Sequence, residues 1–195
     1  SMFAANYELR HVASEDQIFK DPVFGKWEMG LNAVGHIDAK YSGNHTGAFT
    51  IMARRTDGKV QAIGFIFTRH IVDEYKDLYN KWLKYMCGTV SLELNADKGY
   101  AARDLAELGI LTRTYSEKEN KHVKILQNLK PNWNNIIWDE ELTDPEYMAQ
   151  ILDYSEGMEP DDCADSAASC IRENSLFSGE STGIMVEEYE DNYKD

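Results

Sequence analysis

Three groups of acidic residues are the strongest candidates for chemistry in this 195-residue chain. Asp38 lies in the segment VGHIDAKYSG and Glu93 in VSLELNADKGY, and both segments are apolar enough to form buried strands. A third group, Asp161, Asp162 and Asp165, stands in EPDDCADSAASCI, where we expect a helix to begin. Carboxylates brought together inside a protein repel one another unless a cation compensates their charge. Two strands and a helix that deliver carboxylates to one point therefore predict a site for Mg²⁺ or Mn²⁺, ions that serve phosphodiester chemistry.

Each acidic group also has an ordinary structural explanation. Asp38 alone fits a strand-end residue satisfied by backbone donors, and Glu93 fits an edge position that faces solvent. Acids at the start of a helix commonly cap it and complement its dipole. Asp97 could bind metal through water, although its position favours the start of the next helix. Asp162 and Asp165 would lie on one helical face, and the small residues around them would let that helix pack closely against a sheet.

Composition predicts a single domain with a substantial hydrophobic core. Of the residues, 43% are hydrophobic. No apolar run approaches the ~18–20 residues of a membrane span, and no leader resembles a signal peptide. The three cysteines have no metal-ligand spacing, which favours a reduced intracellular protein over a disulfide scaffold. We therefore expect no membrane association.

The net charge of −14 is unevenly distributed along the chain. Residues 139–195 contain 18 acidic and two basic residues, whereas residues 1–138 carry a net charge of +2. The acidity is therefore local, and it does not exclude a nucleic-acid partner. We expect the far end of the chain to be a solvated or disordered acidic tail.

Hydrophobic periodicity predicts an alternation of strands and helices after an irregular stretch at residues 3–32. An Asp-Gly turn at 57–58 joins two strand-like runs, so the first three strands should form an antiparallel meander. Later strands that alternate with helices should add in parallel. The expected strands are 33–42, 47–55, 59–69, 89–95 and 110–116, with a short extended piece at 136–140. The expected helices are 70–86, 97–109, 117–130, 144–156 and 161–174. The sequence therefore predicts an α/β fold with a mixed five-stranded sheet and helices on both faces.

Four segments together resemble a known family. They are IDAKYSGNHTGAFTIMARRTDGKV, LELNADKGYAARDL, NKHVKI and DPEYMAQILDYSEGMEPDDCADSAAS. In this order they resemble the C-terminal nuclease domain of the large terminase subunit of tailed bacteriophages, and FAANYEL resembles the stretch that joins the terminase ATPase to that domain. The resemblance implies an RNase H-like fold and a two-metal endonuclease that cuts concatemeric viral DNA during genome packaging. It also implies that residues 1–32 are a linker remnant from a missing N-terminal ATPase domain, 33–173 the nuclease and 174–195 an acidic tail.

The resemblance assigns roles to the acidic residues. Asp38 would be the central ligand that bridges two Mg²⁺ or Mn²⁺ ions, and Glu93 would hold the second ion. On the last helix Asp162 is the first choice as a ligand, Asp165 the second and Asp161 the least certain. We thus expect Asp38, Glu93 and Asp162 to be catalytic, with Asp165 as a further metal ligand.

The resemblance also implies double-stranded DNA as substrate and the cytoplasm of an infected or lysogenic bacterial host as location. Its implied partners are the terminase ATPase domain in the same full-length chain, the portal and the small terminase subunit. Phosphate contacts would come from basic residues, for which an ordinary solvated surface remains the alternative. His36 could orient the site from behind or be a packed core histidine. The candidates for contact with DNA are Lys40, Arg54, Arg55, Lys121, His122 and Lys124.

Two other functions remain open from the sequence. The same fold and metal acids would serve a Holliday-junction resolvase or a transposase-like nuclease. A chain with this acidic second half could instead be a non-catalytic interaction module that mimics DNA.

Overall fold

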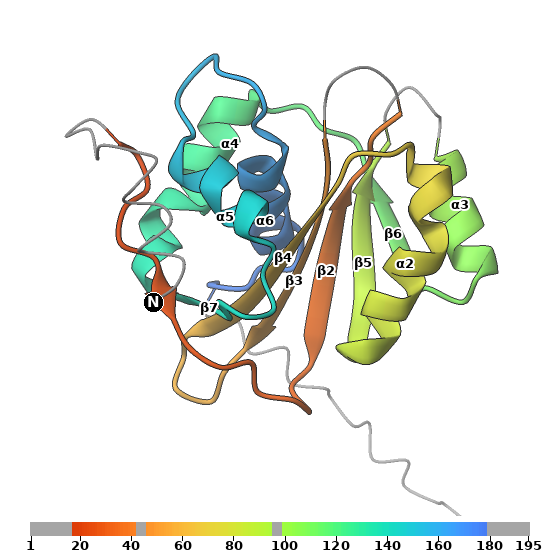
Figure 1. Cartoon of the computed structure of the whole chain (residues 1–195), viewed down its shortest axis with the longest axis horizontal. Coiled ribbons are helices and arrows are strands. Elements are labelled where there is room, and N and C mark those ends of the chain that lie inside the picture. Colours follow the sequence, from red (N-terminus) through yellow and green to blue (C-terminus); the bar gives the residue numbers. More distant parts are fainter. Residues whose placement is uncertain (1–16, 42–45, 95–98, 179–195) are drawn as a thin grey trace, which may run out of the picture.

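A mixed seven-stranded sheet with helices on both faces forms the domain (Figure 1). The computed structural model describes residues 17–41, 46–94 and 99–178. The strands are β1 (Val23–Phe24), β2 (Ala33–Asp38), β3 (Gly47–Arg54), β4 (Val60–Phe67), β5 (Cys87–Glu93), β6 (Thr112–Tyr115) and β7 (Ile136–Trp138). The helices are α2 (Ile71–Lys84), α3 (Tyr100–Glu107), α4 (Lys121–Asn128), the 3₁₀ helix η1 (Lys130–Asn135), α5 (Pro145–Leu152) and α6 (Asp162–Glu173).

The order of strands in the sheet is β1-β7-β4-β3-β2-β5-β6. The predicted antiparallel meander is confirmed as β2, β3 and β4, and the predicted parallel additions are confirmed as β5 beside β2 and β6 beside β5. The predicted count of five strands is two too low, because β7 pairs with β4 and β1 pairs with β7. These two strands are two and three residues long, too short to show a period of two in the sequence.

The hairpin between β3 and β4 forms at the predicted Asp-Gly turn. Gly58 adopts a positive φ of 81°, a region that favours glycine, and the Lys59 amide donates to Asp57 Oδ1 at 3.0 Å. β3 is buried at every position from Gly47 to Ala53, since it lies inside the sheet with helices on either side. The meander therefore supplies the rigid centre of the fold.

Helices α4, α5 and α6 cover one face of the sheet, and α2 and α3 cover the other (Figure 1). The α6 helix lies against β2 and β3 through small side chains, as its sequence predicted: Ala164, Ala167 and Ala168 have no exposed surface. On β4, a side chain at Gly64 would come within 2.2 Å of the Tyr147 ring, so glycine there lets α5 approach the sheet. Both helices are thus held close to the strands.

Several predicted helix boundaries are wrong; the helix predicted over 144–156, for example, ends at Leu152. The helix predicted over 70–86 ends at Lys84, and β5 begins three residues later, at Cys87. The chain reverses at Met86, which itself adopts a positive φ of 51°. The helix predicted from residue 117 begins instead at Lys121, because Asn120 caps it by accepting from the Val123 amide. Residues 117–120 are therefore free to approach the sheet edge.

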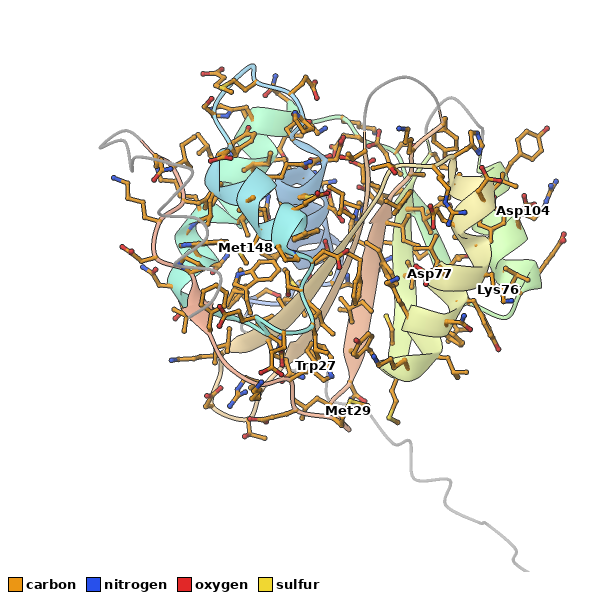
Figure 2. The ribbon with its side chains drawn as sticks, viewed as in Figure 1. Trp27, Met29, Lys76, Asp77, Asp104 and Met148 are labelled. Carbon is orange, nitrogen blue, oxygen red and sulfur yellow. The ribbon has the colours of Figure 1, made fainter. Side chains whose placement is uncertain are left out.

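Parts of the predicted linker and tail pack against the sheet. Phe19 is fully buried with its ring centroid 5.0 Å from that of Trp133, and the Trp27 amide donates to Asp139 Oδ2 at 2.7 Å. Figure 2 shows Trp27 near the end of the sheet where β2 begins. Leu176, past α6, is 7% exposed. The remainder of both predicted segments, residues 1–16 and 179–195, lies outside the described residues.

None of the described helices is long and apolar enough to cross a membrane.

Candidate active site

Asp38 and Glu93 end two neighbouring parallel strands. In the pairing of β2 with β5, Ile37 lies opposite Leu92, so the acids that follow them reach the same edge of the sheet. Alternation along a strand places Asp38 on the same face as His36, two residues before it. That face is the one covered by α6, because His36 Nδ1 lies 3.1 Å from Ser166 Oγ.

The α6 helix brings Asp162 and Asp165 to the same edge. Both acids are on its first turn, and their exposed fractions are only 6% and 5%. Asp162 Oδ2 accepts two hydrogen bonds from Thr46, one from the backbone amide at 3.1 Å and one from the hydroxyl at 2.7 Å. The predicted convergence of β2, β5 and α6 is therefore present in the geometry.

Two lysines from α4 lie among these carboxylates. Lys121 Nζ is 2.6 Å from Asp161 Oδ1, 3.7 Å from Asp162 Oδ1 and 3.8 Å from Asp165 Oδ2. Lys124 Nζ is 2.7 Å from Asp165 Oδ1. We call Asp38, Glu93, Asp162 and Asp165, together with Lys121 and Lys124, the acidic cluster.

A second row of ion pairs supports the cluster from behind. Lys124 also contacts Glu117 Oε2 at 2.8 Å, and its side chain is 1% exposed. Glu117 accepts in turn from Arg172 Nη1 and Nη2, at 3.1 and 2.8 Å. Although burial opposes it, these hydrogen bonds from Arg172 and Lys124 hold the pKa of Glu117 below its usual range. Glu117 and Arg172 were not among the predicted site residues, because their partners are distant in the sequence.

The electrostatics of the cluster favour an additional positive charge. Burial raises the pKa of Asp38 well above its ordinary value, and the neighbouring Asp165 and Asp162 raise it further. Burial also raises the pKa of Glu93 and of Asp165, against the opposing effect of the lysines. The cluster, its supporting row and Asp161, which pairs with Lys121, together contain six carboxylates and three cations. The carboxylates are Asp38, Glu93, Glu117, Asp161, Asp162 and Asp165, and the cations are Lys121, Lys124 and Arg172.

Oxygen ligands in excess of their counter-charges fit a hard divalent cation. Within the described parts of the chain, however, no three or more aspartate, glutamate, histidine or cysteine side chains are grouped as they would be around a single ion. The ammonium groups of Lys121 and Lys124 lie between the carboxylates and supply the compensating charge in this arrangement. The donor chemistry therefore fits Mg²⁺ or Mn²⁺, with the lysines as competing cations.

His36 is a buried member of a hydrogen-bonded chain beneath the cluster. Its Nε2 lies 2.9 Å from Tyr115 Oη, and Ser166 Oγ, which its Nδ1 contacts, lies 2.8 Å from Thr50 Oγ1. Burial, with the nearby charges of Lys124 and Arg172, lowers the pKa of His36 well below its usual value. A neutral histidine therefore joins β6, β2 and α6 directly behind Asp38.

The other predicted residues are dispersed. Lys40, two residues past Asp38, is half-buried at the same edge of the sheet. His122 Nδ1 lies 2.8 Å from Tyr154 Oη. Asp97 lies outside the described residues.

Arg54 and Arg55 belong to the opposite end of the sheet. Asp38 pairs with Ala48, and Arg54 lies six positions further along β3, a span of roughly 20 Å. Arg54 donates to the Leu176 and Ser178 carbonyls at 2.7 and 2.8 Å. The structure thus does not bring this pair of arginines to the acidic cluster.

Lys124 has a different role from the predicted contact with DNA phosphate. A side chain that is 1% exposed and held between Glu117 and Asp165 has no surface to offer a phosphate. The sequence NKHVKI does not distinguish it from an exposed lysine, since the partner carboxylates are seven and 41 residues away.

The raised pKa of Asp38 predicts how stability depends on pH without metal. The folded state holds the Asp38 proton more tightly than the unfolded chain, so the contribution of Asp38 to the free energy of unfolding should rise as pH falls from 7 through the raised pKa. The lowered pKa of His36 acts in the opposite direction as pH falls below about 6.5. Below about pH 4.5, the ordinary value of Glu117, the lowered pKa of that residue should reverse the trend. Urea unfolding in EDTA between about pH 3.5 and 7.5 would measure these effects. The difference between the parent and Asp38→Asn isolates the Asp38 contribution, and parallel curves would contradict it.

No protein-family model matches the sequence, and no curated protein matches it at the sequence level. Solved structures do match the fold. The large terminase nuclease of thermophilic phage G20c superposes with a TM-score of 0.55 at 14% identity, covering 77% of this chain and 92% of the G20c chain. The nuclease domain of the large terminase subunit of bacterial virus Sf6 gives a TM-score of 0.56 at 10% identity, covering 74% and 90%.

The large terminase of another thermophilic bacteriophage gives a TM-score of 0.52 at 10% identity. It matches over 82% of this chain but only 43% of its own length. The G20c nuclease has been solved with zinc, cobalt or magnesium, and the Sf6 domain with manganese or calcium. At 10–14% sequence identity, the similarity to these structures shows the fold alone. The chain has the RNase H-like fold of the nuclease domains of phage large terminase subunits.

Proposed function

We propose that the chain is the metal-dependent DNA endonuclease domain of a phage large terminase, cutting concatemeric viral DNA during genome packaging. The observation that carries this proposal is the meeting of Asp38, Glu93, Asp162 and Asp165 at one sheet edge, with more negative charge than their lysines compensate. The fold shared with terminase nucleases supports it.

Different carboxylates would coordinate each of the two ions. Asp38, at the centre, would contact both, Glu93 would hold one from β5, and Asp162 with Asp165 would hold the other from α6. When bound, Mg²⁺ or Mn²⁺ lowers the pKa of a water and stabilises the leaving 3′ oxygen of a phosphodiester. The residues of this chain would supply oxygen ligands from three rigid elements. Water would be the nucleophile, so no side chain of the protein needs to attack the phosphate.

DNA would reach this edge of the sheet. Lys121 has a side chain that is 36% exposed, so it can meet a phosphate as well as the acids. Lys40 and His122 are the other candidates on this side, whereas Arg54 and Arg55 would serve only a duplex that extends along the sheet. We further propose an ATPase domain in the full-length chain, the portal and small terminase subunit as partners, and action in the cytoplasm of the bacterial host.

Burial argues against the alternative of a DNA mimic. A mimic must present its acids to a partner, but Asp162 and Asp165 are 6% and 5% exposed and are ion-paired inside the domain. A resolvase of the same fold would use the same acids, so the preferred DNA substrate is what separates it from a terminase nuclease.

Supercoiled plasmid incubated with the chain and millimolar Mn²⁺ tests the proposal directly. We expect nicked and then linear DNA, and no product in EDTA. Branched and linear duplexes of the same sequence, offered in competition, separate the two nuclease classes, because a resolvase would prefer the branched form. Intact plasmid at every Mn²⁺ concentration would contradict the nuclease assignment for this domain.

A further inference from the structure

We propose that Gln150 and Thr46 are positioning residues that fix the carboxylate of Asp162 so that its Oδ1 faces the acidic cluster. The inference rests on the proposed function, since it concerns how one of the proposed ligands is presented. It is carried by a chain of three side chains from three elements, the α5 helix, the segment before β3 and the α6 helix.

The first contact fixes one oxygen of Asp162. Thr46 donates its hydroxyl and its backbone amide to Asp162 Oδ2, at 2.7 and 3.1 Å. Two donors on one oxygen leave the carboxylate little freedom to rotate. The other oxygen, Oδ1, is the one that lies 3.7 Å from Lys121 Nζ. Asp162 therefore presents Oδ1 to the cations of the cluster.

The second contact fixes Thr46. Gln150 Nε2 donates to Thr46 Oγ1 at 3.2 Å, so that hydroxyl accepts from Gln150 while it donates to Asp162. Gln150 Oε1 accepts from the Cys163 amide at 2.7 Å. A backbone amide can only donate, which fixes the oxygen of the glutamine toward α6 and its nitrogen toward Thr46.

Gln150 also caps the start of the α6 helix, which the side chain of an N-terminal aspartate usually does. Asp161 is the N-cap residue of α6, but its side chain makes no capping hydrogen bond. The amide of Cys163, in the first turn, is instead capped from α5 by Gln150. Acids at the start of a helix ordinarily accept hydrogen bonds from the unpaired backbone amides of its first turn. The side chains of Asp161 and Asp162 are thereby left for Lys121 and for the cluster.

The position of Gln150 in its helix is otherwise hard to explain. The α5 helix has the sequence PEYMAQIL, and Tyr147, Met148, Ile151 and Leu152 in it are buried in the core. A glutamine in that setting, at 9% exposure, needs hydrogen-bond partners for both ends of its amide. The two partners it has are the first turn of α6 and the residue that holds Asp162.

Metal affinity tests the relay, by which we mean the hydrogen-bonded chain from Gln150 through Thr46 to Asp162, with a readout other than cleavage. Thr46→Val removes the hydroxyl with little change in shape, and Gln150→Met removes the amide. We expect each to weaken Mn²⁺ binding in calorimetry by about ten-fold or more, as loss of a partner behind a metal ligand commonly does. Thr46→Ser should restore the parent affinity. Because both residues act on one carboxylate, the double variant should lose much less than the product of the two single effects.

A matched threonine and a direct view of Asp162 complete the test. Thr112→Val removes a hydroxyl that donates to the Ala102 carbonyl, and it should leave Mn²⁺ affinity unchanged. Parent-like affinity in Thr46→Val, or no recovery in Thr46→Ser, would overturn the proposal. If the parent itself bound no Mn²⁺, the proposed function would fail first. The crystal structures of the parent and Thr46→Val in EDTA would then decide: a turned Asp162 carboxylate supports the relay, and an unmoved one overturns it.

Discussion

Asp38→Asn is expected to abolish DNA cleavage and, in the same protein, to raise the stability of the metal-free domain. Loss of the proposed central ligand should lower the cleavage rate by roughly 1,000-fold or more, which corresponds to about 4 kcal/mol of transition-state stabilisation. The gain in stability follows from the raised pKa of Asp38, because a neutral amide no longer meets burial and the charges of Asp165 and Asp162. Plasmid cleavage rates in Mn²⁺ and urea unfolding in EDTA measure the two effects.

Two comparisons make this prediction specific. Glu93→Gln should act in the same direction, with a smaller gain in stability because Glu93 is only half-buried. Asp73→Asn replaces an acid in the first turn of α2, on the other face of the sheet, and should leave cleavage unchanged. If Asp38→Asn and Glu93→Gln both cleaved at the parent rate, the assignment of the metal ligands would be wrong. Loss of activity together with lower stability would indicate a merely structural role for Asp38.

Opposite signs for activity and stability are what distinguish a functional acid from a structural one here. An acid that caps a helix or pairs with a lysine stabilises the fold, so its removal weakens both properties. The charged form of Asp38 lowers the stability of the folded protein, since burial and its acidic neighbours disfavour that form. Such a residue is explained by what it binds.

The meeting of the four acids at one sheet edge could be predicted from the sequence, because local pattern and strand geometry decide where each acid lies. An acid at the end of an apolar run becomes the last residue of a buried strand, and parallel neighbours bring their last residues to one edge. Asp38 and Glu93 follow directly from this, given the pairing of Ile37 with Leu92. Asp162 and Asp165 follow from helical spacing and from the small residues that allow α6 to lie against β2 and β3.

The compensating charges could not be predicted in the same way. Segment 117–124 has the composition of a solvated, charged helix, yet it provides Glu117 and Lys124 to the interior. The partner of Glu117 on α6 is Arg172, 55 residues away, and only the packed fold decides that pairing. The pairing of the short strands β1 and β7 could not be predicted for a related reason. Residues 136–140 were expected to be extended but not to join the sheet, and β1 was not expected, since two or three residues pair only once β4 offers an edge.

Thr46 and Gln150 could be predicted only in part, less well than the acids but better than the compensating charges. A glutamine within the apolar stretch of α5 is a visible anomaly in the sequence, because a buried amide needs partners at both ends. The sequence gives no hint of which partners it has. Only the approach of α5 to α6 and to the start of β3 places its amide between Cys163 and Thr46.

Lys124→Met is expected to destabilise the domain more than any change at an exposed charge. The ammonium of Lys124 lies 2.7 Å from Asp165 and 2.8 Å from Glu117, inside the protein. Methionine fills similar volume but leaves Asp165 beside Asp38 and Asp162 without its nearest cation. Removing one partner of a buried ion pair typically costs about 3–5 kcal/mol, since the other charge stays buried. Urea unfolding at pH 7 in EDTA measures the loss.

Lys121 and Asp165 provide the matched controls for that experiment. Lys121→Met should cost about 1 kcal/mol or less, because its side chain is 36% exposed and solvent screens its ion pairs. Combining Lys124→Met with Asp165→Asn should restore much of the stability, since the uncompensated carboxylate is then gone and Arg172 still pairs with Glu117. Equal losses for the two lysines, or no recovery in the double variant, would mean that Lys124 acts through packing rather than charge. Added Mn²⁺ provides the last distinction: an ion that binds the acidic cluster should stabilise Lys124→Met more than the parent, because it then replaces the missing charge beside Asp165.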